Sequence, residues 1–278
     1  MAEPLETHVS CDLCGADDPQ QVLSKSGGFY VRCRPCGFVY ASPRAAHPLA
    51  ENAEVYQRGM LSCVKGMYLP RRQRAYRRLL RRFRPFRKTN RLLEIGSNVG
   101  GFLYAARQAG WEAVGVEPAE ACARYARETH GLQAIAATLE ESGLAADTFD
   151  VIFSNAVFEH LESPSRTLKA AARVLRPGGV IYTNTVNYES YTRELLGAEW
   201  QLLAPKEHLS LYTPQTLQRF CTQAGLEILA VHSSGVRSSA RRTLPGMNGL
   251  WKAARSALSR FTLKGDRIIV LARKPAAP

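Results

Sequence analysis

The sequence predicts an α/β protein in which helices cover both faces of a parallel sheet, preceded by a small separate module. Two observations support this. From Leu92 onward, short apolar runs alternate with helical patterns, which is typical of βαβ units. Ahead of them, two Cys-x2-Cys pairs stand near the N-terminus. The 278 residues suffice for one sizeable domain and one small module.

Seven apolar runs are expected to form the sheet. Glycine adopts the left-handed conformation that closes a helix, and the helical patterns end at Gly110, Gly131 and Gly225. The expected strands are residues 92–95, 112–116, 132–136, 149–154, 180–184, 226–231 and 267–272. Helices are expected over 100–109, 119–129 and 214–224, with a basic amphipathic insertion at 250–261.

The N-terminal cysteines have the spacing of a metal site. Cys11, Cys14, Cys33 and Cys36 form the pattern C-x2-C-x18-C-x2-C, which is typical of four-thiolate zinc. A glycine follows each pair and lets the chain turn back toward the thiolates. Four thiolates leave no open position for water, so the zinc is expected to be structural. A pair of disulfides is the alternative and requires an oxidising compartment.

The segment after this ribbon is expected to connect the two parts. We divide the chain into a ribbon at 1–44, a connector with a basic helix at 45–90 and a main domain at 91–278. Tyr56 and Tyr68 are possible lid aromatics, although burial is the simpler reading. The isolated Cys63, Cys122 and Cys221 are expected to be small core residues.

The basic helix contains eleven Arg and Lys residues between Arg71 and Arg91 and no acid. Tyr76, Leu79, Leu80 and Phe83 follow one another at helical spacing and predict an apolar stripe packed on the core. The arginines then cover the other faces. A solvated face is the simpler reading of such a run, and a phosphate-binding surface is the alternative.

The composition places few limits on the partner. The net charge of +13 favours a polyanionic partner without establishing one. No apolar run is long enough to cross a bilayer, and the N-terminus lacks the pattern of a secretory signal. We therefore expect a cytoplasmic protein with no membrane span, whose oligomeric state the sequence does not indicate.

A glycine-rich turn follows the first strand of the main domain. The stretch from Glu94 to Gly101 joins that strand to a helix, as expected of a loop that holds a nucleotide-type ligand. A tight loop without a ligand is the alternative. Glu117 lies after the second strand, 23 residues beyond Glu94, near the roughly 20 residues expected for an acid that binds ribose hydroxyls.

Four motifs in order resemble those of class I S-adenosylmethionine-dependent methyltransferases. They are EIGSNVGGFL, VGVEP, FDVIFSNAVFEHL and VLRPGG, and the similarity covers about residues 90–273. The cysteine module is similar to one that precedes a subset of these enzymes. Asn98 departs from the family pattern, which has a glycine there. The resemblance implies a Rossmann-like seven-stranded methyltransferase sheet behind a zinc ribbon.

The same resemblance implies the cofactor contacts. The turn residues Gly96, Ser97, Asn98, Gly100 and Gly101 would hold the methionine moiety of S-adenosylmethionine, with Glu94 below them. Glu117 would bind the ribose, Thr138 and Leu139 would flank the adenine, and Asn155 would lie near the methyl-transfer line.

His208 and His160 are the candidate general bases. Histidine titrates near neutral pH, as suits proton removal from a hydroxyl or an acidic carbon. His208 lies in PKEHLSLYT, which is similar to a segment of sugar C-methyltransferases that carries a functional histidine. Trp200 and Tyr212 are expected to wall a substrate pocket beside it. Helix capping is the alternative role for this segment.

The leading hypothesis is therefore methyl transfer to oxygen or carbon of a small molecule, such as a sugar, a glycan precursor or a secondary metabolite. Methylation of tRNA or rRNA is the alternative, in which the ribbon and the basic helix bind phosphates. Strand four ends in Ser154-Asn155-Ala156-Val157 rather than the Asn/Asp-Pro-Pro-aromatic tetrad of base-amine methyltransferases, which favours a small acceptor. A zinc-held binding protein without activity is the third possibility.

Overall fold

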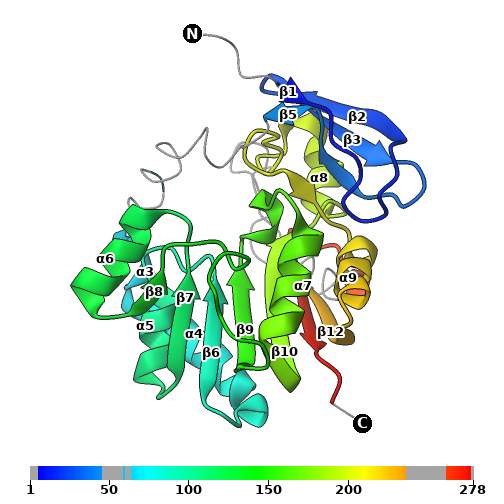
Figure 1. Cartoon of the computed structure of the whole chain (residues 1–278). Coiled ribbons are helices and arrows are strands. Elements are labelled where there is room, and N and C mark those ends of the chain that lie inside the picture. Colours follow the sequence, from blue (N-terminus) through cyan, green and yellow to red (C-terminus); the bar gives the residue numbers. More distant parts are fainter. Residues whose placement is uncertain (1–5, 46–58, 60–63, 236–260, 277–278) are drawn as a thin grey trace.

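The computed structural model describes residues 6–45, 59, 64–235 and 261–276 (Figure 1). Tyr56 and Cys63 lie outside these residues, as does the expected insertion at 250–261 apart from Phe261. Within the described part, two sheets dominate: a large one of seven strands and a ribbon sheet of four. They meet at the end of the large sheet to which the carboxyl ends of its parallel strands point.

The large sheet has the strand order β12-β13-β10-β9-β6-β7-β8, with the crossover beside β6 (Figure 1). All seven expected strands are present. Their bounds are β6 (Arg91–Ile95), β7 (Glu112–Val116), β8 (Gln133–Ile135), β9 (Phe149–Asn155), β10 (Leu175–Val186), β12 (Glu227–Ser234) and β13 (Arg267–Arg273). The expectation of a wholly parallel sheet is wrong at one strand, because β13 runs antiparallel to both β10 and β12.

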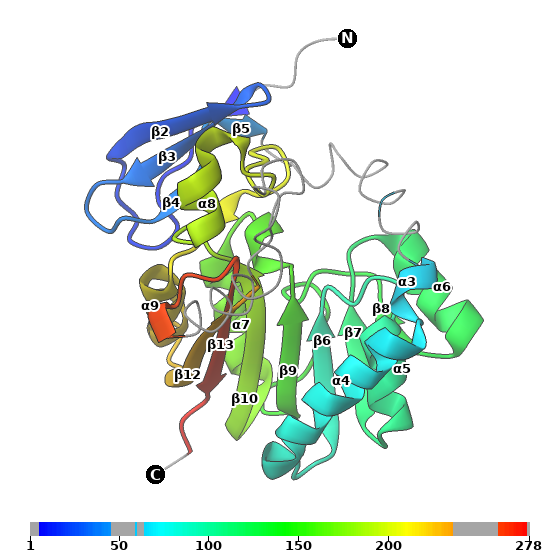
Figure 2. The same ribbon diagram turned by 180° about the vertical axis from the view of Figure 1, so that it is seen from behind.

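Helices cover both faces of this sheet, as predicted. On one face α4 (Pro70–Phe83) packs beside α5 (Gly101–Gln108), as Figure 2 shows. The other face carries α7 (Pro164–Val174) and α9 (Pro214–Gln223). The remaining helical elements are α3 (Val64–Met67), α6 (Glu120–His130), α8 (Tyr191–Leu196), η1 (Arg84–Phe86), η2 (Phe158–His160) and η3 (Gly197–Glu199).

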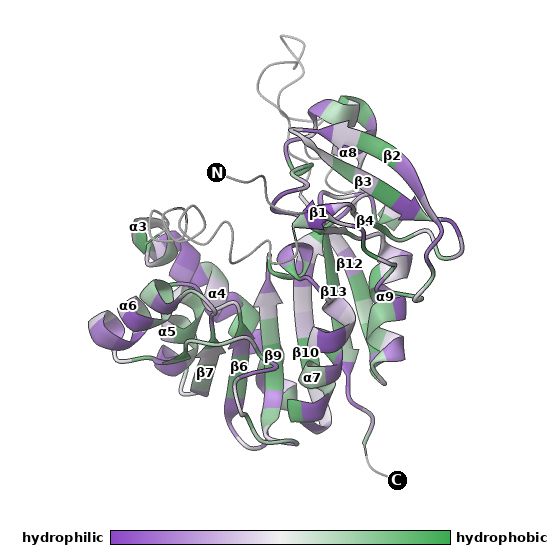
Figure 3. Ribbon diagram, turned by 45° about the horizontal axis from the view of Figure 1, so that its top comes forward, coloured by the Kyte–Doolittle hydropathy of each residue, from purple (hydrophilic) through white to green (hydrophobic). Residues whose placement is uncertain are grey.

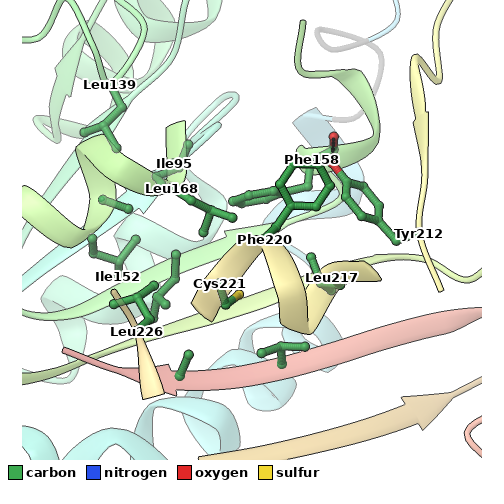
Figure 4. Packing of buried hydrophobic residues seen from close by; sticks show 14 of the residues in the cluster. Ile95, Leu139, Ile152, Phe158, Leu168, Tyr212, Leu217, Phe220, Cys221 and Leu226 are labelled. Carbon is green, nitrogen blue, oxygen red and sulfur yellow. Dashed lines mark hydrogen bonds between the residues drawn. The ribbon is translucent and has the colours of Figure 1, made fainter. Parts of the chain in front are cut away.

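The core is largest beneath α7 and α9. There Leu168 of α7 and Phe220 of α9 belong to the same apolar cluster as Ile152 of β9 (Figure 4). In Figure 3, hydrophobic residues follow the central strands, whereas the covering helices carry both hydrophobic and hydrophilic residues. Local signals fix the helix starts: Ser163 caps α7, and Thr213 with Thr216 forms a capping box on α9.

The ribbon sheet has the order β11-β4-β3-β2 and takes its last strand from the main domain. Its strands are β2 (Pro19–Lys25), β3 (Gly28–Cys33), β4 (Val39–Ala41) and β11 (Ser210–Leu211). A further pair joins β1 (Glu6–Thr7) to β5 (Arg44–Ala45). Because β11 directly follows the segment that contains His208, that segment is tied to the ribbon by strand pairing.

Side chains of the ribbon also dock on α7 and α9. The carboxylate of Asp12 accepts hydrogen bonds from the amide and hydroxyl of Ser165 at 2.8 and 2.9 Å, at the start of α7. The ring of Phe38 meets the ring of Phe220 edge to face, with 5.0 Å between centroids. The ribbon is thus packed on the main domain by both polar and apolar contacts.

The helices in the part that the structure describes include none of the length and apolar character needed to cross a bilayer.

Candidate active site

The glycine turn has the backbone conformation that its sequence requires. Gly96, Asn98 and Gly100 all have positive φ, at 70°, 49° and 83°. A Cβ at Gly96 would collide with the side chain of Val157, so only glycine leaves room there. Val157 precedes η2, and the turn after β6 therefore lies directly against the segment that carries His160.

Glu117 holds this turn in place. Its two carboxylate oxygens accept hydrogen bonds from the amides of Asn98 and Ala119, at 2.9 and 3.0 Å. The side chain is buried, and burial raises its pKa against the lowering effect of those two amides. The carboxylate thus links the ends of β6 and β7. Each oxygen keeps a further lone pair, so ribose binding stays a prediction consistent with this geometry.

Two polar atoms beside the turn are buried without a partner among the described residues: Oε2 of Glu94 and Oγ of Ser97. Burial raises the pKa of Glu94 well above its ordinary value, and the nearby Glu117 adds to the rise. The Glu94 carboxylate accepts a hydrogen bond from the backbone of Leu103, which opposes this rise. Buried polar groups normally find partners, so an unpaired carboxylate oxygen and an unpaired hydroxyl at a glycine turn fit a polar ligand with cationic groups. The residues present are thus suited to S-adenosylmethionine.

The residues after β8 differ in exposure. Thr138 is partly exposed, and its hydroxyl donates to the carboxylate of Glu141 at 2.8 Å. Leu139 is 1% exposed and packs in the largest core cluster. Only the backbone of Leu139 is therefore placed to border a ligand, and the adenine contact of both residues stays a prediction.

Asn155 is the last residue of β9 and is exposed at the carboxyl end of this central strand. Its side-chain oxygen accepts a hydrogen bond from the amide of Asn184 in β10, at 2.8 Å. The next residue, Ala156, has a positive φ of 57° and donates its amide to the Asn184 carbonyl. This pairing aims the end of β9 toward η2 and leaves Asn155 exposed beside the glycine turn.

The structure brings the two candidate histidines together. Their ring centroids are 4.8 Å apart, although 47 residues separate them in the chain. Nδ1 of His160 lies 2.8 Å from the carbonyl oxygen of Glu207, and Nδ1 of His208 lies 2.7 Å from that of Leu202. A carbonyl only accepts, so each Nδ1 carries a proton, and a ring that carries that proton alone has its lone pair on Nε2.

Glu159 is a functional candidate that the sequence reasoning missed. It is 1% exposed, and its carboxylate accepts from Arg267 at 2.8 Å and from the Thr185 hydroxyl at 2.6 Å. Burial acts to raise its pKa, but the charge of Arg267 and the hydrogen bond from Thr185 oppose this and the pKa is lowered, so the carboxylate stays ionised. Burial lowers the pKa of His160, which is therefore neutral near pH 7. The Glu-His pair in AVFEHL, residues 156–161, is the sequence signal that could have identified it.

Trp200 and Tyr212 do not wall a pocket as expected. Their exposed fractions are 2% and 0%, and both pack within apolar clusters. The Tyr212 hydroxyl donates to the carbonyl of Phe158 at 2.9 Å, beneath η2. These aromatics are therefore core residues that pack beneath the segments carrying His160 and His208. Large aromatic residues dominate core packing, which is why their type alone misled the prediction.

The four cysteines converge as their spacing predicts. All four sulfur atoms lie within 4.8 Å of one another. The closest pairs, Cys11 with Cys36 and Cys14 with Cys33, are 3.4 and 3.5 Å apart, well beyond the roughly 2.05 Å of a disulfide bond. Gly15 and Gly37 have positive φ, and their amides donate to the carbonyls of Cys11 and Cys33. The two halves of the cluster thus repeat one turn geometry.

The basic helix α4 packs as its stripe predicts. Leu80 and Phe83 are buried, whereas Tyr76 and Leu79 are partly buried beside them. Gln73 is also buried and donates to the carbonyls of Met67 and Gly101, at 3.0 and 2.9 Å. The exposed positions carry Arg71, Arg72, Arg74, Arg77, Arg78, Arg81 and Arg82. Within the described ranges, none of these seven forms an ion pair.

The comparison with protein families agrees with this geometry. The sequence profile of the family described as "Methyltransferase domain" matches residues 68–231, from just before α4 into β12. The chain belongs to this methyltransferase family. This membership agrees with the prediction of an S-adenosylmethionine-dependent methyltransferase from the sequence. The matched residues include the glycine turn, Glu117, η2 and His208, which places the candidate site within the family's own domain.

The methyltransferase is also similar to individual proteins. A ubiquinone biosynthesis O-methyltransferase of Aromatoleum aromaticum is 31% identical over 150 residues, which are 49% of this chain and 64% of that relative. The match thus spans less than two thirds of the relative's length. A chain from a complex with the Haloferax volcanii Trm112 methyltransferase activator has a TM-score of 0.58 at 16% identity, covering 82% and 98% of the two chains.

A second solved structure has the same fold. It is an S-adenosylmethionine-dependent methyltransferase from Archaeoglobus fulgidus, with a TM-score of 0.55 at 18% identity, and the match covers 73% of this chain and 94% of that one. At such identities the two structures bear on the fold alone.

Proposed function

We propose that this methyltransferase methylates an oxygen or an acidic carbon of a small molecule, with His208 as the general base. The observation that carries the proposal is the histidine pair beside the glycine turn. Val157 packs on Gly96, His160 follows in the same short segment, and His208 faces His160. A proton acceptor therefore lies next to the predicted cofactor loop, which is the arrangement that such a transfer needs.

The two histidines would have different roles. S-adenosylmethionine, when bound, supplies an activated methyl group. The lone pair on Nε2 of His208 takes the acceptor proton, because its Nδ1 is occupied at the Leu202 carbonyl. The ionised carboxylate of Glu159 lies in the same cluster and stabilises the imidazolium that results. His160 orients the acceptor while neutral.

The class of acceptor follows from the site and from the relatives. The similar protein of Aromatoleum aromaticum is named as an O-methyltransferase of ubiquinone biosynthesis, which favours a hydroxyl oxygen of a small molecule. A sugar, a glycan precursor or a secondary metabolite remains our proposed range, with phenols included. A phenol or sugar hydroxyl holds its proton at neutral pH, so a positioned base is needed in either case.

The test uses radiolabelled S-adenosylmethionine with two probes, 3,4-dihydroxybenzoate as a catechol and UDP-glucose as a sugar nucleotide. We expect label transfer to one of them and a loss of at least about 100-fold in kcat for His208→Asn. His232→Asn is the matched control, because His232 lies in β12 away from this cluster. Wild-type turnover in His208→Asn would remove His208 from the role of base.

We also propose that the cysteine cluster binds one structural zinc ion. Four converging cysteine sulfurs are the donor set that structural zinc prefers, and four thiolate ligands leave no position for a reacting water. Burial raises the pKa of Cys33 to about 11, so its thiolate requires a cation nearby. The ion would hold together the two glycine turns from which the ribbon is built.

RNA methylation is a second candidate, and the charge distribution supports it. Eleven of the 37 Lys and Arg residues lie between Arg71 and Arg91 without an acid, leaving 26 basic and 24 acidic residues elsewhere. The positive charge of the protein is thus concentrated on α4 and the residues after it. Such a surface fits a phosphate backbone, and its test is binding rather than turnover.

A further inference from the structure

The segment that carries His208 is held by a tyrosine of the ribbon. Tyr30, in β3, is fully buried, and its hydroxyl donates a hydrogen bond to the carbonyl oxygen of His208 at 2.8 Å. The same hydroxyl accepts one from the amide of Ala204 at 3.2 Å. One phenol therefore bridges the first and last residues of the segment 204–208.

Other contacts between the same two parts reinforce this bridge. The amide of Ala41 donates to the Leu209 carbonyl at 2.9 Å, where β4 meets β11. Lys25 donates from Nζ to the carbonyl of Trp200 at 2.6 Å. A Cβ on Gly28 would lie 2.7 Å from Cγ of Pro205, so the start of β3 touches the segment directly.

The orientation of the His208 ring depends on this same stretch of chain. Its Nδ1 bonds to the carbonyl of Leu202, and its amide donates to the carbonyl of Ala204 at 2.7 Å. The ring is thus oriented by the backbone just before it, and that backbone is fixed by Tyr30. Displacing the segment by about 1 Å would move Nε2 relative to the acceptor and slow the reaction strongly.

We propose that Tyr30 is a positioning residue, through which the ribbon sets the place of His208 in the active site. The inference rests on the proposed role of His208 as base. The ribbon then contributes to catalysis by positioning His208, in addition to any contribution to stability. The residues predicted to bind the methyl donor lie in the turn after β6 and at the end of β7, so Tyr30 should affect the acceptor step without affecting cofactor binding.

Tyr40 provides a matched control on the neighbouring strand. It is 2% exposed, as deeply buried as Tyr30, but its hydroxyl has no hydrogen-bond partner among the described residues. Tyr40→Phe removes a hydroxyl that makes no hydrogen bond there. Tyr30→Phe leaves the carbonyl of His208 and the amide of Ala204 without the hydroxyl as their partner. Both variants keep the aromatic ring and its packing, so they differ in the hydrogen bonds that the hydroxyl makes.

The first measurement is hydrogen exchange of the full-length variants over residues 202–209. We expect the amides of Ala204 and His208 to exchange at least about tenfold faster in Tyr30→Phe and at the wild-type rate in Tyr40→Phe. Binding of S-adenosylmethionine, measured by calorimetry, should agree with wild type within about twofold in both. Unchanged exchange in Tyr30→Phe, or equal acceleration in the two variants, overturns the proposal.

The second measurement is steady-state transfer to whichever probe the wild-type enzyme methylates. Tyr30→Phe should lower kcat about tenfold or more with little change in the KM for S-adenosylmethionine. Gly28→Ala should shift kcat in the same direction by pushing Pro205, since Gly28 has no positive φ that alanine would strain. A wild-type kcat in Tyr30→Phe overturns the proposal.

The two proposals fail in different ways. If neither probe is methylated by the wild-type protein, the proposed acceptor class is wrong, and hydrogen exchange still decides whether Tyr30 holds the His208 segment. If transfer occurs and Tyr30→Phe keeps both wild-type exchange and wild-type kcat, the proposed function stands and the role of Tyr30 is wrong.

Discussion

The carboxylate of Glu117 accepts the amide of Asn98 at 2.9 Å, so an acid after β7 fixes the turn after β6. The two residues are 19 positions apart, and their contact ties together the carboxyl ends of two adjacent parallel strands. Asn98 can be held there because it tolerates the positive φ that its position requires. Glu117 thus shapes the predicted cofactor loop, and ribose binding stays its second predicted role.

Glu117→Ala should weaken the binding of S-adenosylmethionine by at least about 100-fold and also lower stability. The substitution leaves two partly buried amides, those of Asn98 and Ala119, without their carboxylate acceptor, at a cost of about 1 kcal/mol each. Calorimetry measures the affinity, and urea denaturation the stability. Glu112→Ala, at the start of β7, is the control, because its side chain is exposed. Equal affinity in Glu117→Ala and wild type would refute both roles.

Glu94→Gln should separate stability from cofactor binding. Because burial raises the folded-state pKa of Glu94 above its unfolded value near 4.5, the folded protein binds the proton more tightly. The stability associated with this group is therefore full below pH 4.5 and declines as the pH rises through the folded-state pKa.

Glutamine removes this decline because it does not titrate. We expect Glu94→Gln without ligand to be at least as stable as wild type at pH 7, while it binds S-adenosylmethionine less tightly. Urea denaturation from pH 5 to 8 gives the first quantity and calorimetry the second. A variant that loses stability at pH 7 would show that the ionised carboxylate is compensated in the folded protein, contrary to its unpaired Oε2.

The positions of the strands along the chain and the glycine turn were predictable because their signals are local. Alternating apolar segments define the strands, and positive φ values require Gly96 and Gly100. The reversed direction of β13 has no such signal, because the pattern of a strand does not record which way it runs. The four cysteines were predictable for a further reason: their spacing reflects the geometry of metal binding itself.

The rest of the site depends on contacts that are distant in sequence. Tyr30 and His208 are separated by 178 positions, and the carboxylate of Glu159 meets Arg267 across 108. No sequence signal near Tyr30 distinguishes it from an ordinary core tyrosine. Conversely, Trp200 is a core residue, although its place near His208 in the sequence indicated a pocket residue. Burial of a polar atom against a remote carbonyl is a property of the fold, and one sequence without its relatives does not reveal it.

Metal analysis tests the cysteine cluster. The purified protein should contain about one zinc ion per chain, and Cys14→Ser should lower that content, because each structural thiolate contributes to the affinity. Cys221→Ala, in α9, is the control and should retain the metal. Zinc titration of chelator-treated protein should release protons, because the thiols must ionise to bind. Full zinc content in Cys14→Ser would exclude a four-thiolate site.

Binding to bulk tRNA at two salt concentrations tests the basic helix. A triple variant with Arg74, Arg78 and Arg81 changed to Glu reverses the charge on exposed positions and leaves the buried stripe of Leu80 and Phe83 intact. If α4 binds phosphates, wild type should bind tRNA at 50 mM salt and lose affinity by about tenfold or more at 200 mM, and the variant should bind at least about 100-fold more weakly.

A matched variant with Arg166, Arg173 and Lys169 of α7 changed to Glu controls for net charge. Equal loss in both variants would mean that net charge alone causes the binding, and absence of binding at low salt would eliminate RNA as the acceptor.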